Sequence, residues 1–287
     1  MASSNSKALH HNRSLSFPSK ENPSTSHLNE SLANARGRDA AASSSSSSLS
    51  SMKTRAKCIT NLYNDIDDLL QMPHTHHIIT QERSIDHLLD GYIGVLDACT
   101  AAKDLVSNTK HDVQGLLSAL RRKDAAGIAS YLASTKLSRK SIHKSLKQLR
   151  SCRSNKHMIC NNNLPKCGES ELVHKLKEAE SVAIAMLESL MSYLGGNKMQ
   201  AASKSGWSLV TKVMLSKKRE DSDSDSDSDS NEFKKIDALL QKSLEGMQVM
   251  NLSKEVDSSI QDLEEELECL FRQLIRTRVL LLNILNN

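Results

Sequence analysis

Serine side chains placed for phosphorylation have the clearest chemical potential in this chain. Arg13, Ser14, Ser16 and Pro18 form the pattern R-S-x-S-x-P near the start of the sequence. A phosphate on Ser16 adds a charge of about −2 and three strong acceptor oxygens, and arginine clusters bind such a group in an extended peptide. The pattern predicts phosphosites at Ser14 and Ser16, with phospho-Ser16 bound by a 14-3-3-type adaptor. The alternative is a chance match in a basic, serine-rich tail.

A second group of candidate phosphosites lies in the repeated Ser-Asp run near residue 220. Acidic residues three positions after a serine are the context that casein-kinase-2-type enzymes prefer. This context applies to Ser222, Ser224 and Ser226, which precede Asp225, Asp227 and Asp229. Because like charges repel at every helical spacing, the run is predicted to be a linker rather than a helix. Two readings stay open, a phosphorylated linker and a solvated acidic one.

Histidine and cysteine residues form no set with the spacing of a metal site. Four of them lie around the expected linker after residue 150, namely Cys152, His157, Cys160 and Cys167, and three lie beside Pro73, namely His74, His76 and His77. Zinc sites use short pairs of ligands that reach one ion together, and the cysteines here are too far apart in sequence. We therefore predict no metal and no cofactor.

Catalytic motifs are also not found in the sequence. It contains no phosphate-binding loop, no dinucleotide fingerprint, no nucleophile elbow and no HExxH. The paired carboxylates Asp65, Asp67 and Asp68 fit the polar face of a helix opposite Ile66 and Leu69. The prediction is a protein that is not an enzyme and has no catalytic residues.

The stretch 121–156 is strongly basic and contains one acid, Asp124. Its bases are Arg121, Arg122, Lys123, Lys136, Arg139, Lys140, Lys144, Lys147, Arg150, Arg153 and Lys156. Three readings are open, a solvated helix face, an anionic membrane surface and a nucleic-acid surface. Nucleic acid is not favoured, because Tyr131 is the single aromatic residue that could stack on a base.

The elements that must position these residues are helices, and the last of them gives the strongest pattern. From residue 256 apolar side chains recur at alternating intervals of four and three, which is the a/d seam of coiled-coil-like packing. The seam comprises Val256, Ile260, Leu263, Leu267, Leu270, Leu274, Leu281 and Ile284, with Thr277 at the intervening position. It is predicted to pack lengthwise against helices of the same chain or to build a homodimer.

The remaining sequence predicts an all-α bundle of long amphipathic helices. Aromatic residues make up 3% of the 287 residues, a composition that suits Leu-rich helices better than sheets. Helical periodicity covers 59–70, ending at Pro73, and 85–120 as one helix or two with a break near Ser107. It also covers 128–149, 172–194, 207–214 and 233–247.

The domain prediction divides the chain into a tail and a bundle. Residues 1–51 are serine-rich and predicted to be disordered. Residues 52–287 are predicted to form the helical-bundle domain, with linkers near 151–168 and 217–231. Neither a signal peptide nor a membrane-spanning run is expected. The predicted location is intracellular and cytoplasmic, with a plastid or a peripheral membrane location left open.

Four segments resemble a plant-specific family of unknown function, the BYPASS-like family. They are HHNRSLSFPSKENPST from His10, LYNDIDDLLQMP from Leu62, LLDGYIGVLDAC from Leu88 and SIQDLEEELECLFRQLIRTRVLLLNIL from Ser259. The resemblance implies a helical protein linked to root and shoot development, and it supplies no catalytic residues. We therefore predict a non-enzymatic regulatory or scaffold protein of plants that acts through protein–protein interaction. The alternative is a peripheral membrane protein that binds anionic lipid through residues 121–156.

Overall fold

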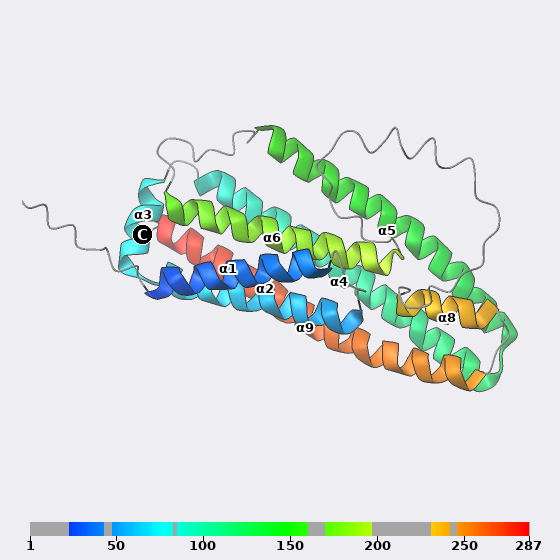
Figure 1. Ribbon diagram of the computed structural model, residues 1–287. Helices are drawn as coiled ribbons and strands as arrows, with labels where there is room; N and C mark the ends of the chain where they lie inside the picture. The colour runs from blue at the N-terminus through cyan, green and yellow to red at the C-terminus, as the bar shows by residue number, and fades with distance from the viewer. Residues whose placement is uncertain are drawn as a thin grey trace, which may run out of the picture.

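The computed structural model describes residues 23–42, 48–82, 85–159, 170–196, 231–241 and 246–286. Within these ranges the chain forms helices and no strands, so the all-α prediction is confirmed. Figure 1 shows the helices lying side by side in an elongated bundle. They are α1 (Pro23–Ala42), α2 (Leu49–Leu70), α3 (Pro73–Gln81), α4 (Ile85–Arg122), α5 (Ala125–Ile159), α6 (Glu171–Leu194), α8 (Glu232–Gln241) and α9 (Gly246–Asn286).

Helix α9 is the central element of the bundle, since it contacts both α2 and α4 along their lengths. Ion pairs from Lys53 to Asp262 and from Arg276 to Asp67 show that α2 and α9 run parallel. Helices α4 and α9 run antiparallel. Helix α6 packs on α4, and α1 lies over both α2 and α6.

Short polar side chains cap the starts of several helices. Ser48 accepts a hydrogen bond from the backbone N–H of Ser51, and Ser170 accepts one from the N–H of Val173. Asp124 Oδ1 accepts from the N–H of Gly127 at 3.1 Å, at the start of α5. These caps satisfy N–H groups that a helix leaves unpaired in its first turn. At Asp124 the cap follows Lys123, whose φ of 54° turns the chain sharply from α4 into α5.

The prediction that residues 1–51 are disordered is wrong for part of that range. Helix α1 occupies 23–42, and α2 begins at Leu49. Leu28, Leu32 and Ala35 stand at positions i, i+4 and i+7, and all three are buried. This single apolar stripe stabilises α1 against its neighbours, although the average composition of the tail is polar. Residues 1–22 and 43–47 lie outside the described residues.

Three other predicted boundaries need correction, and the choice between one helix and two over 85–120 is settled as one. Pro73 begins α3, as a proline at the first helical position can, instead of only ending α2. Helix α4 runs unbroken past Ser107, and α5 continues to Ile159, into the predicted linker 151–168. The predicted helix 233–247 is divided between α8, which ends at Gln241, and α9. The predicted helix 207–214 lies outside the described residues, as does all but Asn231 of the linker 217–231.

Candidate functional site

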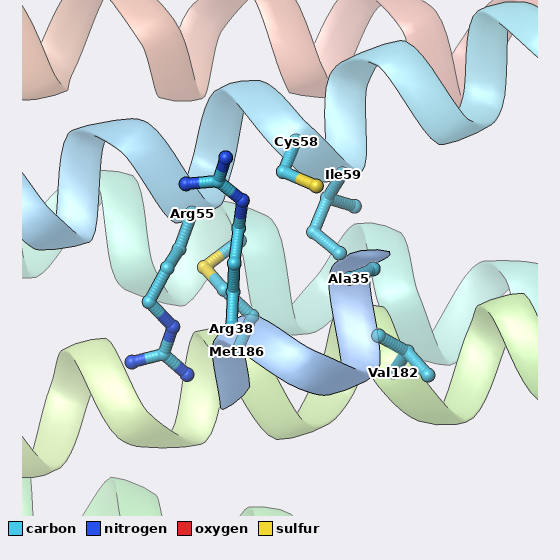
Figure 2. A pocket seen from close by; sticks show the side chains of 7 residues that line it. All are labelled: Ala35, Arg38, Arg55, Cys58, Ile59, Val182 and Met186. Atoms are coloured by element: carbon cyan, nitrogen blue, oxygen red, sulfur yellow. The ribbon is translucent and has the colours of Figure 1, made fainter. Parts of the chain in front are cut away.

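One hollow of the bundle lies among α1, α2 and α6. Figure 2 shows the guanidinium groups of Arg38 and Arg55 turned away from each other, so they do not converge on a common anion. Arg55 is buried and donates to Met52 Sδ at 3.4 Å. Burial raises the pKa of the Cys58 thiol, and the charge of Arg38 offsets part of that rise. The hollow is too tight for a water molecule, so it is a packing feature rather than a ligand site.

A second hollow lies where α4, α5, α6 and α8 meet, and it has room for about one water molecule. Tyr131 lines it with a buried hydroxyl that has no hydrogen-bond partner among the described residues. Asp112 accepts from Ser134 Oγ at 2.8 Å, and Arg139 pairs with Asp237 at 2.5 Å. Burial raises the pKa of Tyr131, so its hydroxyl stays protonated. The arrangement joins α5 to α4 and α8 and is suited to holding a bridging water.

The predicted seam of α9 lies entirely in the core of the chain. Each of its members is buried, with at most 4% of its surface exposed. The partners are α2 on one side and α4 on the other. The side chains are Val256, Ile260, Leu263, Leu267, Leu270, Leu274, Leu281 and Ile284, and Thr277 is buried with them. The seam is therefore used for packing within one molecule.

The border between α9 and α2 contains a buried carboxylate, Asp67, that joins three groups of α9. Thr277 Oγ1 donates to Asp67 Oδ1, and Gln273 Nε2 donates to Oδ2 at 2.7 Å. Arg276 Nε lies 3.1 Å from the same Oδ2. Each oxygen of the carboxylate thus has at least one donor, which is what a buried charged group requires.

Two opposing influences act on the ionisation of Asp67. Burial raises its pKa, and the hydrogen bonds from Thr277 and Gln273 and the charge of Arg276 partly oppose that rise. The prediction that Asp65, Asp67 and Asp68 form a solvated polar face is wrong for two of them. Asp67 is buried, and the partly buried Asp65 accepts from Ser31 of α1. Asp68 is exposed, as predicted.

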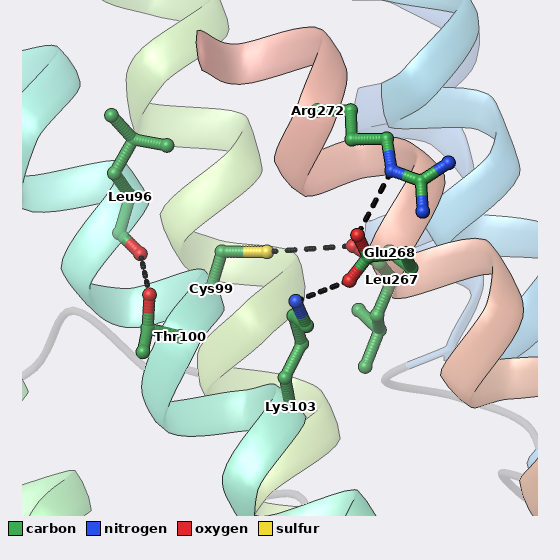
Figure 3. Close-up of polar contacts among 7 residues, drawn as sticks. All are labelled: Leu96, Cys99, Thr100, Lys103, Leu267, Glu268 and Arg272. Atoms are coloured by element: carbon green, nitrogen blue, oxygen red, sulfur yellow. Dashed lines mark hydrogen bonds and ion pairs between the residues drawn. The ribbon is translucent and has the colours of Figure 1, made fainter.

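The border between α9 and α4 is charged in the part that lies nearer the N-terminus of α9. Lys110 Nζ lies 2.8 Å from Glu264, and Lys103 pairs with Glu268, which also pairs with Arg272. Figure 3 shows the contacts of Lys103 and Arg272 with Glu268 beside the buried Cys99. The bond from Lys103 lowers the pKa of Glu268, and the bond to Glu264 raises the pKa of Lys110. Both pairs favour the charged forms at neutral pH.

The part of the same border that lies nearer the C-terminus of α9 is apolar. Phe271 and Ile275 stand seven residues after Glu264 and Glu268, and Leu96 and Leu89 stand seven and fourteen residues before Lys103. Because seven residues are nearly two helical turns, each apolar residue shares its face with a charged one. The Nζ of Lys103 lies 4.4 Å from the centre of the Phe271 ring, where the charged part meets the apolar part.

Large side chains on this apolar part of the border remain exposed to solvent. The exposed fraction is 40% for Ile93, 42% for Ile275 and 46% for Val279. We call the set the apolar border; it comprises Leu89, Ile93 and Leu96 of α4 and Phe271, Ile275 and Val279 of α9. The sequence interpretation did not single out these residues as a surface, because the a/d seam accounted for α9 and core-facing periodicity accounted for α4. Their signal was a second apolar stripe beside the seam, which points to a protein-contact surface.

Close packing of α4 on α2 and α6 forms the core beneath this surface. Tyr63 and Tyr92 meet edge to face, with ring centres 5.8 Å apart, and both are buried. A Cβ atom at Gly91 would lie 2.0 Å from the carboxylate of Glu180, so the glycine leaves room for that side chain of α6. Burial raises the pKa of Tyr92, which keeps its hydroxyl neutral. This buried arrangement gives the apolar border a fixed support.

The predicted phosphosites Ser14, Ser16, Ser222, Ser224 and Ser226 all lie outside the described residues. The side chains of Cys152, His157, Cys160 and Cys167 also fall outside them. Among the histidines beside Pro73, His76 Nε2 lies 2.9 Å from the Leu70 carbonyl, where it ties α3 to the end of α2. In the described part of the chain, the cysteines Cys58, Cys99 and Cys269 are free thiols.

The fold and the two borders of α9 define a helical-bundle protein whose long last helix is shared by two neighbouring helices. A protein-family model described as Protein BPS1 matches residues 57–284. The chain therefore belongs to that family, and the resemblance to the BYPASS-like family is confirmed. No curated protein and no solved structure matches the chain.

Family membership supports the assignment of a plant developmental regulator. The matched range runs from α2 to α9, so it includes both borders of α9. Within the described residues, no helix combines the length and the apolar character needed to cross a membrane.

Proposed function

We propose that this protein is a non-enzymatic scaffold or regulator of root and shoot development in plants that acts by binding other proteins. The observation that carries the proposal is the apolar border. Three of its side chains, Ile93, Ile275 and Val279, expose large apolar surfaces on a rigid, well-packed framework. Several exposed apolar side chains on two helices that pack against each other are typical of protein-contact sites.

The chemistry of the apolar border fits an amphipathic helix as the bound element of the partner. Two antiparallel helices present parallel rows of apolar side chains, into which a third helix can place residues at i, i+4 and i+7. At one end of the rows lie Lys103, Glu268 and Arg272. These charges are suited to fixing the direction of a helix that carries complementary charges at that end.

The test compares three forms of the tagged full-length chain in plant seedlings. The variant Ile275→Ser/Val279→Ser removes the apolar border, and Met247→Ser is the control, since Met247 is 76% exposed at the far end of α9. Cross-linking and mass spectrometry identify the partners of each form. We expect partners that the wild type and Met247→Ser retain and the double variant loses. The same partners in all three forms would refute the role of the apolar border.

A phosphorylated tail is the second part of the proposed mechanism. The pattern from Arg13 to Pro18 supports binding of phospho-Ser16 by a 14-3-3-type adaptor. Calorimetry with a peptide spanning residues 8–22 measures this directly, in unphosphorylated, phospho-Ser14 and phospho-Ser16 forms. We expect adaptor binding for phospho-Ser16 alone. Equal affinity for the unphosphorylated peptide would contradict the proposal, and so would no binding in any form.

Phosphorylation of the Ser-Asp run is the third part. Ser222, Ser224 and Ser226 stand in an acidic context that supports modification by a casein-kinase-2-type enzyme. Mass spectrometry of the protein from plant tissue, with and without an inhibitor of that kinase class, tests the assignment. Inhibitor-sensitive phosphate on these serines is the expected result. Unmodified serines in both samples would count against it.

A further inference from the structure

Helix α5 differs from the other long helices in its charge. Residues 125–159 contain no aspartate or glutamate, whereas α4 and α9 contain both acids and bases. Figure 1 shows α5 along one edge of the bundle. Ile142 and Leu146 are buried on the side that faces the core, which fixes the opposite side toward solvent.

The structure separates the bases of α5 into two kinds. Arg139 pairs with Asp237 and therefore ties α5 to α8. Lys136, Lys140, Lys144 and Lys147 recur at intervals of four, four and three, are exposed, and form no ion pair with any described residue. Their charges are thus not neutralised by the bundle and stand in one row on its surface.

An exposed leucine lies within this row. Leu137 has 67% of its surface exposed, and it shares a face with Lys140 and Lys144, three and seven residues further on. We call the row with this residue the basic face; it comprises Lys136, Leu137, Lys140, Lys144 and Lys147. A basic helix face that also carries an exposed apolar side chain is the pattern of helices that lie on anionic membranes.

The same structure disfavours nucleic acid as the ligand of the basic face. Tyr131, the one aromatic residue of α5, is 5% exposed and points into the core. The basic face therefore offers lysines and the exposed imidazole of His143, but no phenylalanine, tyrosine or tryptophan ring on which a base could stack. Lysines with an exposed leucine match lipid headgroups and the acyl chains beneath them better than they match a phosphate backbone alone.

We propose that the basic face of α5 binds the surface of membranes rich in anionic phospholipid. The lysines attract the headgroups, and Leu137 inserts among the acyl chains. This surface lies on a different helix from the apolar border, so the inference goes beyond the proposed partner binding and does not depend on it. The two surfaces together would let the protein hold a partner at a membrane.

The test measures sedimentation of the full-length chain with phosphatidylcholine vesicles that contain or lack phosphatidylserine. We expect binding that requires phosphatidylserine and weakens as salt is raised. Lys140→Gln/Lys144→Gln should lower the partition coefficient by about 25-fold, since each base near an anionic surface contributes a factor of about five. The control is Lys57→Gln/Lys254→Gln, which removes the same charge from exposed sites on α2 and α9.

Leu137→Ser separates membrane insertion from charge attraction alone. It leaves the charge unchanged, and we expect several-fold weaker vesicle binding with an unchanged circular-dichroism melting curve. Equal loss in the control double variant would overturn the proposal, as would no phosphatidylserine-dependent binding. Tighter binding to a duplex or single-stranded oligonucleotide than to vesicles, unaffected by Leu137→Ser, would assign the basic face to nucleic acid instead.

Discussion

The two borders of α9 differ in where they place polar and apolar side chains. Toward α2 the border is closed by a buried carboxylate, Asp67, that receives bonds from Thr277 and Gln273. Toward α4 it is closed at the surface by ion pairs such as Lys110–Glu264, and beyond Phe271 it becomes exposed apolar surface. Around Asp67 the border with α2 hides a polar cluster, whereas beyond Phe271 the border with α4 leaves apolar groups in water.

This difference indicates how the bundle divides stability and recognition. A buried, fully paired polar group penalises every register but one, because a shifted helix would leave Asp67 without its donors. Exposed ion pairs and apolar side chains contribute little to stability. The surface residues of the border between α9 and α4, which we call the α4 border, can therefore change or bind partners without loss of the fold. The residues of the border between α9 and α2, the α2 border, cannot.

The largest effect is expected in the seam that both borders share. Leu267→Ala or Leu270→Ala should lower the free energy of unfolding by about 2–5 kcal/mol, because each leucine is fully buried and leaves a cavity. Chemical denaturation measures the change. Leu137→Ala is the control, since this exposed leucine should shift stability by no more than about 0.5 kcal/mol. An unchanged free energy of unfolding in the seam variants would refute the packing described for α9.

Removal of the buried carboxylate should have the next largest effect. Asp67→Ala leaves the buried Thr277 hydroxyl and the Gln273 amide without their acceptor, at a cost of about 1–3 kcal/mol. The neighbouring Asp68→Ala is a matched control, because Asp68 is exposed. Denaturant unfolding of both variants gives the comparison. Equal stability of the two variants would mean that the α2 border does not depend on its polar cluster.

The sequence was sufficient to predict the seam of α9, and the reason is physical. A long helix that packs on two neighbours must repeat its apolar residues every seven positions, and this period is visible without a structure. The burial of Asp67 could not be predicted in the same way. Its place in a run of acids looks like a solvent face, and only the approach of Thr277 and Gln273, some 200 residues later, gives it partners.

The same reasoning explains why α1 and the apolar border were missed. The stripe of Leu28, Leu32 and Ala35 lies in a serine-rich stretch of sequence. It stabilises a helix only because α2 and α6 bury it. Ile275 and Val279 lie beside a stronger seam, so periodicity alone cannot show whether a neighbour covers them. Both features depend on contacts between distant segments.

The raised pKa of Asp67 predicts a pH dependence that distinguishes the borders further. The folded state holds the Asp67 proton more tightly than the unfolded state, so ionisation costs stability. As pH rises from the ordinary Asp range through the raised pKa, the wild type should lose stability relative to Asp67→Asn. Denaturation of both proteins across this range measures the difference. A difference that grows in favour of the wild type as pH rises would show that the donors outweigh the effect of burial.

The smallest effect is expected at the charged part of the α4 border. Lys110 and Glu264 are 23% and 31% exposed, so solvent screens their attraction. A double-mutant cycle with Lys110→Ala and Glu264→Ala should give a coupling energy of about 0.2–1 kcal/mol that declines as salt is raised. The parallel cycle with Asp67→Ala and Gln273→Ala should give a larger coupling that salt barely changes, because Asp67 is buried. The two couplings could instead be equal in size and in salt dependence. The α4 border would then be as essential to the fold as the α2 border. Its apolar part would have to be explained by packing rather than by the binding of a partner.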